Sequence, residues 1–247
     1  MKKRSFVTIL VLLIVWMISG EMVDNPIKLP SFFDVAERMI ELALDSGFYE
    51  AFAHTLARSF FGLLLALFMG VFFGVFSGIS HKFEEYFEPV YTILKSIPNV
   101  SYILIVLIWT NSRIATCVIG FMVMFPMAYA NTLSGMKSIE SKYLNLMRIY
   151  PVRRSYKIFK VYLPLISHYI YASFSNGLGL TFKVGIMAEI LGSVSPGLGR
   201  QFQLCRINVD MIGIFAWTIW LVLFLIVFEA ILKFLQNKFI KDEEIHD

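Results

Sequence analysis

Hydrophobic residues in this chain come in long blocks that short polar segments separate. The blocks are about 20 residues long, the length of an α-helix that crosses the hydrocarbon core of a bilayer. They lack the strict apolar/polar alternation of a transmembrane β-barrel. The pattern therefore predicts an all-α, polytopic membrane protein with about six spans in a single domain over residues 1–247. The predicted spans cover residues 1–23, three spans within 54–133 and two within 167–235.

The segments between the spans carry their own signals. Residues 31–46 have charged and apolar positions on opposite helical faces, which predicts a helix lying along the outer membrane surface. We expect an inner turn from Ser80 to Glu88, an outer loop from Ser193 to Asp210, and a charged inner tail over 236–247. Within the third span, Pro98 predicts a kink because it removes a helical hydrogen bond, and we expect Lys95 to snorkel to the interface.

Composition supports a membrane protein and excludes several kinds of site. The chain is 57% hydrophobic and 16% charged, with a mean hydropathy of +0.69. Average soluble domains have about 45–50% apolar and about 25% charged residues. Its two cysteines, Cys117 and Cys205, both lie in or beside apolar segments. Two cysteines support neither a disulfide framework nor a four-ligand metal site. We predict no metal and no cofactor.

The distribution of positive charge predicts that both termini are cytoplasmic, because cytoplasmic loops carry the excess of Lys and Arg. With the amino terminus inside, fifteen basic residues fall on inner segments and six on outer ones. The inner residues are Lys2, Lys3, Arg4, Lys82, Lys95, Lys137, Lys142, Arg148, Arg153, Arg154, Lys157, Lys160, Lys233, Lys238 and Lys241. The outer residues are Lys28, Arg38, Arg58, Arg113, Arg200 and Arg206.

The largest inner connection, residues 134–166, contains two short amphipathic helices. A break is predicted at Tyr150-Pro151, because a residue before proline is pushed out of the helical region and proline suits the first helical position. After the break, apolar residues recur at helical spacing beside a basic stripe. The apolar positions are Val152, Tyr156, Phe159 and Leu163, and the basic ones are Arg153, Lys157 and Lys160. Confinement between two spans argues against a nucleic-acid patch.

Two predicted spans carry residues with a specific meaning. Gly70, Gly74 and Gly78 are four apart, so they form one stripe on which another helix can pack closely. The span from Ser167 to Leu191 is interrupted by polar residues that a lipid-facing helix would not carry, among them Asn176, Lys183 and Glu189. This span is expected to face protein or a watery path.

Catalytic chemistry is missing from the sequence. The four histidines are scattered, and neither a His-Glu-x-x-His nor a Gly-x-Ser-x-Gly motif occurs. A phosphate-binding Gly-x-x-x-x-Gly-Lys-Ser/Thr loop is absent too. The sequence therefore predicts a protein that is not an enzyme. If it moves a solute uphill, the energy comes from a partner or from an ion gradient.

At this point the inner connection resembles the coupling motif of ABC importer permeases. That motif reads Glu-Ala-Ala, three residues, Gly, nine residues, then Ile-x-Leu-Pro. The Leu-Pro end matches Leu163-Pro164, and Val161 is a conservative replacement. The Glu-Ala-Ala place holds Asn145-Leu146-Met147 and the Gly place holds Pro151, so these do not match. The departures predict a coupling helix of altered shape.

Nearly the whole chain resembles the nitrate/sulfonate/taurine type of permease. That type has a Thr/Ser-Leu-x-Arg entry into a glycine-rich span, then a proline and an Ile-Pro. After the coupling loop come Gly-Leu-x-Leu, a Lys or small residue, Ala-Glu and Gly-Leu-Gly. The matching places are Thr55 to Arg58, Pro89, Ile97-Pro98, Gly177 to Leu180, Lys183, Ala188-Glu189 and Gly197 to Gly199.

The resemblance implies a permease subunit that dimerises in the lipid bilayer. Two cytoplasmic ATP-binding subunits would dock on the coupling helices, and an extracytoplasmic binding protein would deliver a small solute of the sulfonate, nitrate, taurine or vitamin-precursor class. The coupling residues implied are Leu144, Asn145, Leu146, Met147, Arg148, Pro151, Leu163 and Pro164. Of these, we expect Leu144, Met147 and Arg148 to enter the partner's groove; alternatively, Leu144 and Met147 pack back on the bundle.

The sequence leaves the residues of the solute path undecided and allows two other functions. Asn176, Lys183 and Glu189 are candidates for the path, although the two charges would also suit an internal ion pair or the interface. An ion-coupled secondary transporter is a second hypothesis, weakened by the lack of an inverted repeat. An intramembrane enzyme is a third. ATP dependence distinguishes the first two.

Overall fold

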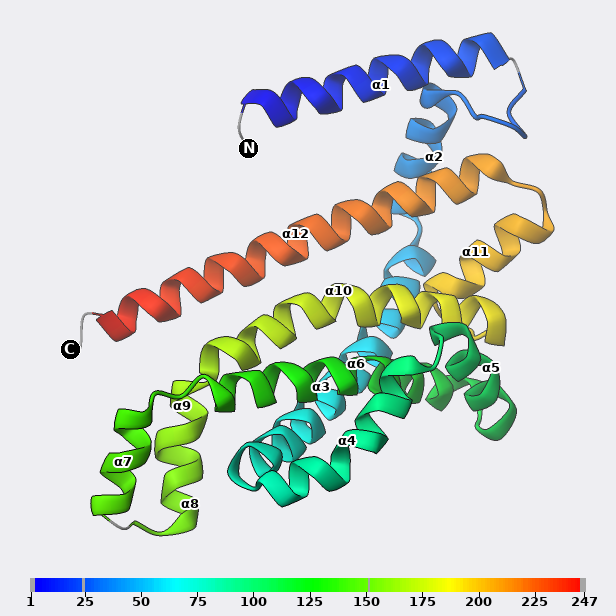
Figure 1. Cartoon of the computed structure of the whole chain (residues 1–247). Coiled ribbons are helices and arrows are strands. Elements are labelled where there is room, and N and C mark those ends of the chain that lie inside the picture. Colours follow the sequence, from blue (N-terminus) through cyan, green and yellow to red (C-terminus); the bar gives the residue numbers. More distant parts are fainter. Residues whose placement is uncertain (1–2, 24, 151, 245–247) are drawn as a thin grey trace. The chain divides into compact units, whose positions relative to one another are not determined.

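The computed structural model describes residues 3–23, 25–150 and 152–244, and every regular element in these ranges is a helix. The predicted all-α class is confirmed. The elements are α1 (Lys3–Val23), α2 (Phe32–Leu44), α3 (Ser46–Ile79), α4 (His81–Ser96), α5 (Asn99–Trp109), α6 (Ser112–Lys137), α7 (Ser141–Ile149), α8 (Arg154–Tyr156), the π-helical turn η1 (Lys157–Tyr162), α9 (Leu163–Leu165), α10 (Ser167–Gly192), α11 (Leu198–Ile207) and α12 (Met211–Glu244) (Figure 1).

The helices form two compact units. The first comprises the described parts of residues 1–53 and 196–247, and the second comprises residues 54–195. The division falls inside α3. A single permease domain over residues 1–247 stays a prediction.

Aromatic side chains hold the first unit together. Trp217 of α12 stacks on Phe48 with ring centroids 5.3 Å apart, and the indole N–H of Trp220 donates to the backbone oxygen of Met39, 3.0 Å away. The Trp16 indole N–H donates to the oxygen of Pro30 at 3.2 Å. Buried tryptophan N–H groups need such partners, so these bonds attach α1, α2 and α12 to one another.

Three helices, α3, α6 and α10, form the core of the second unit. The glycine stripe of α3 faces α6, where a Cβ added at Gly70, Gly74 or Gly78 would lie only 2.4–2.6 Å from a side chain. The opposing residues are also four apart: Ala128, Thr132 and Met136. Glycine thus permits a helix separation that any larger residue would prevent. The same helix, α6, also packs against α10 and α5.

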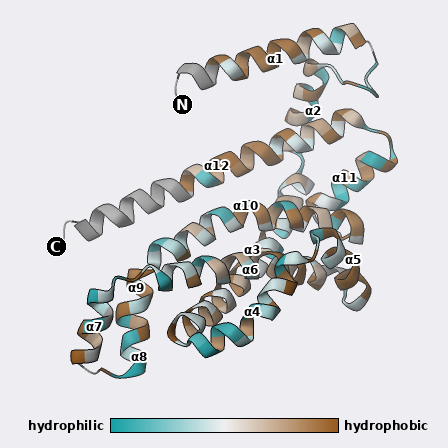
Figure 2. Cartoon of the chain, viewed as in Figure 1, coloured by the Kyte–Doolittle hydropathy of each residue, from teal (hydrophilic) through white to brown (hydrophobic). Residues whose placement is uncertain are grey.

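Three described helices are long and apolar enough to cross a membrane: Ser46–Ile79, Ile114–Lys137 and Met211–Ile231. The pair α4 and α5 would add a fourth span if counted as one. The apolar stretch Val7–Val23 of α1 is shorter, and α10 carries several polar residues. Figure 2 shows the contrast between apolar α12 and the more polar α7 and α8. The number of six spans stays a prediction.

Several predicted boundaries are wrong, and local signals explain them. The expected turn over residues 80–88 belongs to α4, which Ser80 caps by accepting a hydrogen bond from the Phe83 N–H at 3.3 Å. Pro89 therefore lies inside this helix and does not begin a span. The expected outer loop from Ser193 to Asp210 contains α11. The spans predicted from residue 54 and up to residue 235 belong to longer helices, α3 and α12.

Candidate functional site

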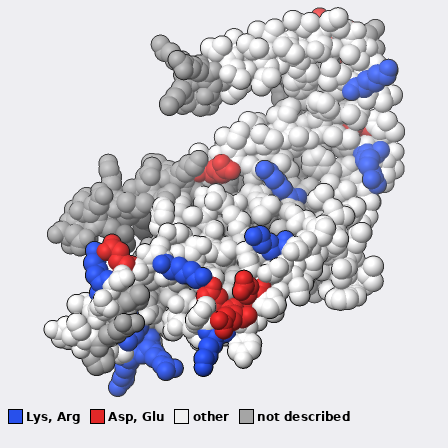
Figure 3. All heavy atoms as spheres, in the orientation of Figure 1, with Lys and Arg blue, Asp and Glu red and all other residues white. Residues whose placement is uncertain are grey.

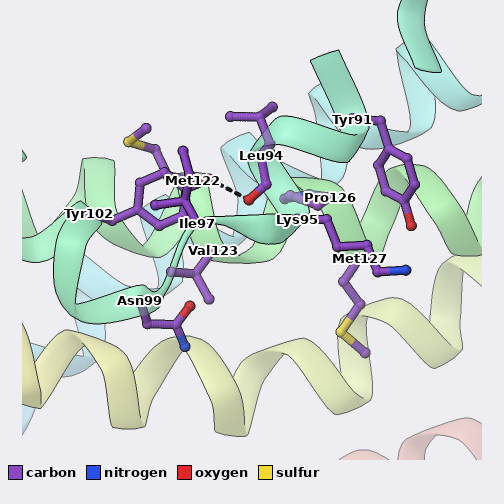
Figure 4. Close-up of a pocket in the computed structure, with 10 residues that line it drawn as sticks. All are labelled: Tyr91, Leu94, Lys95, Ile97, Asn99, Tyr102, Met122, Val123, Pro126 and Met127. Carbon is purple, nitrogen blue, oxygen red and sulfur yellow. Dashed lines mark hydrogen bonds between the residues drawn. The ribbon is translucent and has the colours of Figure 1, made fainter. Parts of the chain in front are cut away.

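A cavity of about 280 Å³ lies where α4 ends and α5 begins, and α6 forms its wall (Figure 4). The lining residues are Tyr91, Leu94, Lys95, Ile97, Asn99, Tyr102, Met122, Val123, Pro126 and Met127. In the close-up, Tyr91 and Lys95 lie at one end, and Tyr102 and Met122 lie at the other. The exposed side chains of Lys95 and Asn99 lie toward opposite ends of the cavity, and Met122, Val123 and Met127 of α6 give it an apolar wall.

A broken helix creates this cavity. The axes of α4 and α5 are bent by 94° across Ile97 and Pro98, so the predicted kink is a complete break. Proline has no N–H, which frees the carbonyl of Leu94, four residues earlier. The Tyr102 hydroxyl donates a hydrogen bond to that oxygen at 2.5 Å. This bond across the break satisfies the freed carbonyl and keeps the start of α5 close to the end of α4.

Replacing Tyr102 by Phe is expected to destabilise the protein by about 1–2 kcal/mol, because the freed Leu94 carbonyl would lose its partner. Unfolding of the purified chain in detergent measures this change. Tyr86→Phe is the matched control, since Tyr86 is 84% exposed on α4. Loss of its hydroxyl should change the free energy of unfolding by no more than about 0.5 kcal/mol. Equal stability of the two variants would contradict the proposed role of the hydroxyl.

A column of side chains four residues apart leads along α4 to the cavity. Its members are Phe83, Phe87, Tyr91 and Lys95. Phe83 and Phe87 stack with an interplanar angle of 8°, and Phe87 and Tyr91 each contact the ring of Tyr129 on α6, at 5.0 and 5.2 Å. The Lys95 ammonium lies 5.6 Å from the centroid of the Tyr91 ring. This aromatic column fixes α4 to α6 and places Lys95 at the end of α4.

Glu189 is buried in an ion pair inside the second unit. Its side chain is 0% exposed, and one carboxylate oxygen lies 2.8 Å from the Arg58 guanidinium. The Thr55 hydroxyl donates to the other oxygen at 2.7 Å. The structure therefore joins the Thr-Leu-x-Arg segment of α3 to the Ala-Glu segment of α10. This geometry favours the internal charge pair over contact of Glu189 with a solute.

The other two candidates on α10 lie on a different face. Asn176 and Lys183 are both exposed, while Gly177, Thr181 and Gly185 are buried against α3 and α6. Seven residues make almost two helical turns, so Asn176 and Lys183 share one face. A helix with this polar face is unsuited to lipid contact, and the structure leaves the face open to a path or a second copy.

The coupling stretch forms two short helical segments separated at Tyr150, the C-cap residue of α7. Pro151 lies outside the described residues. The second segment, α8, η1 and α9, contains a π-helical turn over Lys157–Tyr162. A π-turn takes more residues than an α-turn. Phe159 and Leu163 of the predicted apolar face still line one apolar hollow beside α3, although Phe159 is 67% exposed and Leu163 packs beside a buried cluster at Ile166. Pro164 is exposed.

The first segment presents a different face from the one predicted. Met147 is buried, which argues against its entry into a partner's groove. Leu146, Ile149 and Tyr150 are 57%, 70% and 69% exposed, and Asn145 is exposed too. The side chains of Leu144 and Arg148 lie outside the described residues. Figure 3 shows Lys and Arg gathered at this end of the second unit, beside acidic side chains.

Sequence patterns gave partial indications of two features, the Arg58–Glu189 ion pair and the cavity at the α4–α5 break, that the sequence analysis did not predict. The sequence places Arg58 in a motif and among the outer basic residues, but it does not pair Arg58 with Glu189, although a carboxylate inside an apolar helix needs a counter-charge. The cavity at the α4–α5 break also has a sequence signal, because Lys95 follows Tyr91 by four residues just before a helix-breaking proline. Lys95 is exposed, and its position at the membrane interface stays a prediction. No local pattern connects positions 131 residues apart, such as Arg58 and Glu189.

Family comparison decides what kind of protein has these features. Residues 62–241 match the family model of the binding-protein-dependent transport system inner membrane component. The chain belongs to this family. It is therefore a multi-pass transport permease, and the matched range contains the cavity, the glycine stripe and the coupling stretch.

Individual permeases are similar over most of their length. The formylaminopyrimidine transport permease protein ThiX of Halalkalibacterium halodurans is 26% identical, over 92% of this chain and 91% of ThiX. The putative aliphatic sulfonates transport permease protein SsuC of Bacillus subtilis is 24% identical, over 94% and 84%. The taurine transport system permease protein TauC of Escherichia coli is 24% identical, over 81% and 74%.

Solved structures support the same fold. The chain is similar to inward-facing structures of the MetNI methionine ABC transporter, with a TM-score of 0.66 and 16% sequence identity. The match covers 78% of this permease and 94% of the solved chain. At this identity the likeness concerns the fold alone.

Proposed function

We propose that this permease is the membrane subunit of an ATP-driven importer for a small solute. Two copies form the path, two cytoplasmic ATP-binding subunits supply the energy, and an extracytoplasmic binding protein delivers the solute. The observation that carries the proposal is the family match over residues 62–241, combined with an exposed apolar face on the coupling stretch. The chain itself supplies the path and the mechanical connection, not the hydrolysis of ATP.

The proposed docking face comprises Leu146, Ile149 and Tyr150, hereafter the α7 face. These residues stand at i, i+3 and i+4, the spacing with which an amphipathic helix enters an apolar groove. All three are more than half exposed. Such large apolar side chains at the polar end of the unit are suited to cover by a protein partner. We therefore propose that the α7 face contacts the ATP-binding subunit, in place of the predicted Met147.

The orientation follows from this docking. If α7 contacts cytoplasmic ATP-binding subunits, the basic residues around it are cytoplasmic, as the positive-inside rule requires. Arg153, Arg154 and Lys160 are exposed beside it. With α7 in the cytoplasm and the predicted six spans, both termini are cytoplasmic, because an even number of spans brings the chain back to the side on which it begins.

The solute path is proposed to run along the polar face of α10. Asn176 and Lys183 lie on that face, and the second copy would enclose it. Relatives are named for formylaminopyrimidine, aliphatic sulfonates and taurine, so the solute is proposed to be small, of the sulfonate, nitrate, taurine or vitamin-precursor class.

Co-purification with the ATPase encoded beside this chain tests the function. We expect the native permease to retain the ATPase, and Ile149→Asp to lower the amount retained about tenfold or more, because a carboxylate would be buried in an apolar groove. Tyr86→Asp is the matched control, with the same new charge at a position 84% exposed on α4.

Two results would contradict parts of this proposal. Retention of the ATPase by Ile149→Asp at the level of Tyr86→Asp would show that the α7 face is not the docking site. Failure of the native permease to retain any ATPase would contradict ATP-driven import, and transport driven by an ion gradient would then be the hypothesis to measure.

A further inference from the structure

An apolar hollow of about 530 Å³, hereafter the α3 hollow, lies between α3 and the second segment of the coupling stretch. All eleven of its lining residues are apolar. Phe68 and Phe159 are 69% and 67% exposed, so the described residues leave both rings largely open. The lining includes three phenylalanines of α3 and three residues of the coupling stretch: Phe68, Phe72, Phe76, Ile158, Phe159 and Leu163.

The π-helical turn shapes one side of the α3 hollow. The Leu163 N–H donates to the backbone oxygen of Ile158, five residues earlier, so the two side chains share one face of the turn. In an α-helix the same two positions would lie about 140° apart around the axis. Lys157 has a different neighbour, because its ammonium donates to the Met147 backbone oxygen of α7 at 3.5 Å. None of the residues of the α7 face lines the hollow, so the two surfaces are separate.

Positive charge surrounds this segment without acidic residues. From Ser141 to Ala188 the chain contains no Asp or Glu, and residues 141–170 include six Lys and Arg. Arg154 is exposed and precedes Ile158 by four residues, which places it one turn earlier on the same helical face. An apolar hollow with a base at its end complements a molecule that has a hydrocarbon chain and an anionic head.

We propose that the α3 hollow binds one acyl chain of an anionic phospholipid, with the lipid phosphate at Arg154. The inference goes beyond the proposed function and shares with it only the cytoplasmic position of the basic segment, where leaflet lipids are anionic. Charge argues against a second copy of the chain as the occupant. A two-fold contact brings the same patch of both copies together, and it would place the two basic segments against each other, which is unfavourable.

The dimensions of the α3 hollow fit a single acyl chain. Its residues on α3 run from Leu64 to Phe76, a length of about 18 Å along the helix. One leaflet contributes about half of the 30 Å hydrocarbon core, roughly 15 Å. A volume of about 530 Å³ equals about 18 water molecules, and a methylene group is similar to water in size. The hollow therefore accommodates one chain of a membrane lipid along most of its length.

Native mass spectrometry of the delipidated full chain in detergent tests the proposal, with 1-palmitoyl-2-oleoyl phosphatidylglycerol as the probe. The first lipid to bind is expected to show about tenfold or higher affinity than phosphatidylcholine with the same acyl chains, which has no net charge. Arg154→Gln should weaken the binding of phosphatidylglycerol about fivefold. Lys82→Gln is the matched control, because it removes an exposed base of α4 outside the hollow.

A second variant tests the hollow itself. Val71→Phe should fill the space and weaken binding several-fold while Arg154 remains. Val90→Phe is its control, since Val90 is 45% exposed on α4 and does not line the hollow. Glycerol 3-phosphate, which has the head and lacks the chains, should not compete.

Three results would overturn the proposal. The first is equal affinity of the native chain for phosphatidylglycerol and phosphatidylcholine, and the second is equal affinity of Arg154→Gln and Lys82→Gln for phosphatidylglycerol. The third is a native dimer that Val71→Phe separates into monomers, which would assign the hollow to a second copy. Retention of the ATPase is measured separately with Ile149→Asp, so failure here leaves the importer function standing.

Discussion

Replacing Arg58 by Met is expected to destabilise the permease by about 3–5 kcal/mol, the cost of removing one partner from a buried ion pair. Glu189 is 0% exposed, so its charge cannot be solvated by water when this counter-charge is removed. Thr55 would still donate its hydrogen bond, but a hydroxyl does not neutralise a carboxylate. The measurement is unfolding of the purified chain, followed by circular dichroism as denaturing detergent is added.

Two further variants make this prediction specific. Arg58→Met combined with Glu189→Met should recover most of the lost stability, because a buried pair can be replaced by apolar residues at little cost. Arg38→Met provides the matched control: Arg38 pairs with Glu41 at 2.8 Å, but both side chains are about half exposed, and an exposed pair contributes about 0–1 kcal/mol. If Arg58→Met and Arg38→Met cost the same, the buried pair is not what joins α3 to α10.

Gly70→Ala is expected to destabilise the protein by about 1–3 kcal/mol, although alanine is the better helix former. Its new Cβ would lie 2.5 Å from the Cβ of Ala128 and 2.9 Å from the backbone nitrogen of Tyr129. A single backbone atom cannot shift without moving the helix to which it belongs. The new Cβ would therefore force α3 and α6 apart. The measurement is the midpoint of unfolding in detergent.

Gly20→Ala is the control for that change, because it makes the same substitution in α1, where the nearest atom would be 3.5 Å away. There alanine should be neutral or stabilising by about 0.5–1 kcal/mol through helix propensity. A stabilised Gly70→Ala would mean that the glycine stripe is not held in close contact with α6.

Local sequence signals predicted the helices well and the joints between them less well. Apolar blocks and the glycine stripe are properties of one helix, so hydropathy and spacing reveal them. The size of the bend at Pro98 depends on what stabilises it, which is the Tyr102 hydroxyl and the packing of α5 on α6. Proline alone indicates only that a hydrogen bond is lost.

Missed elements have equally concrete causes. Pro196 and Gly197 favoured a loop over residues 193–210, but Gly197 is the N-cap of α11, and six of the ten residues of α11 are Leu, Arg or Gln, which are good helix formers. On α7 the sequence could not decide which apolar residues face the bundle. Met147 is buried and Leu146 is exposed. The following helical segment lies nearby, where the Lys157 ammonium donates to the Met147 backbone oxygen at 3.5 Å, and the sequence does not show such a tertiary contact. The pairing of Arg58 with Glu189 is set by the tertiary fold.

The break at Pro98 also gives α5 mechanical leverage. The aromatic column and the Lys137–Glu84 bond fix α4 to α6. The next helix, α5, is a rigid rod of 11 residues, about 16 Å long, and it is held separately, by Ile103 and Val106 buried against α6 and α10. A rotation of about 10° at the break would swing the far end of this rod by about 3 Å, close to the diameter of a water molecule. Since the pivot lies beside the cavity, a small movement there would be amplified at the far end of α5, and the shape of the cavity would change with it.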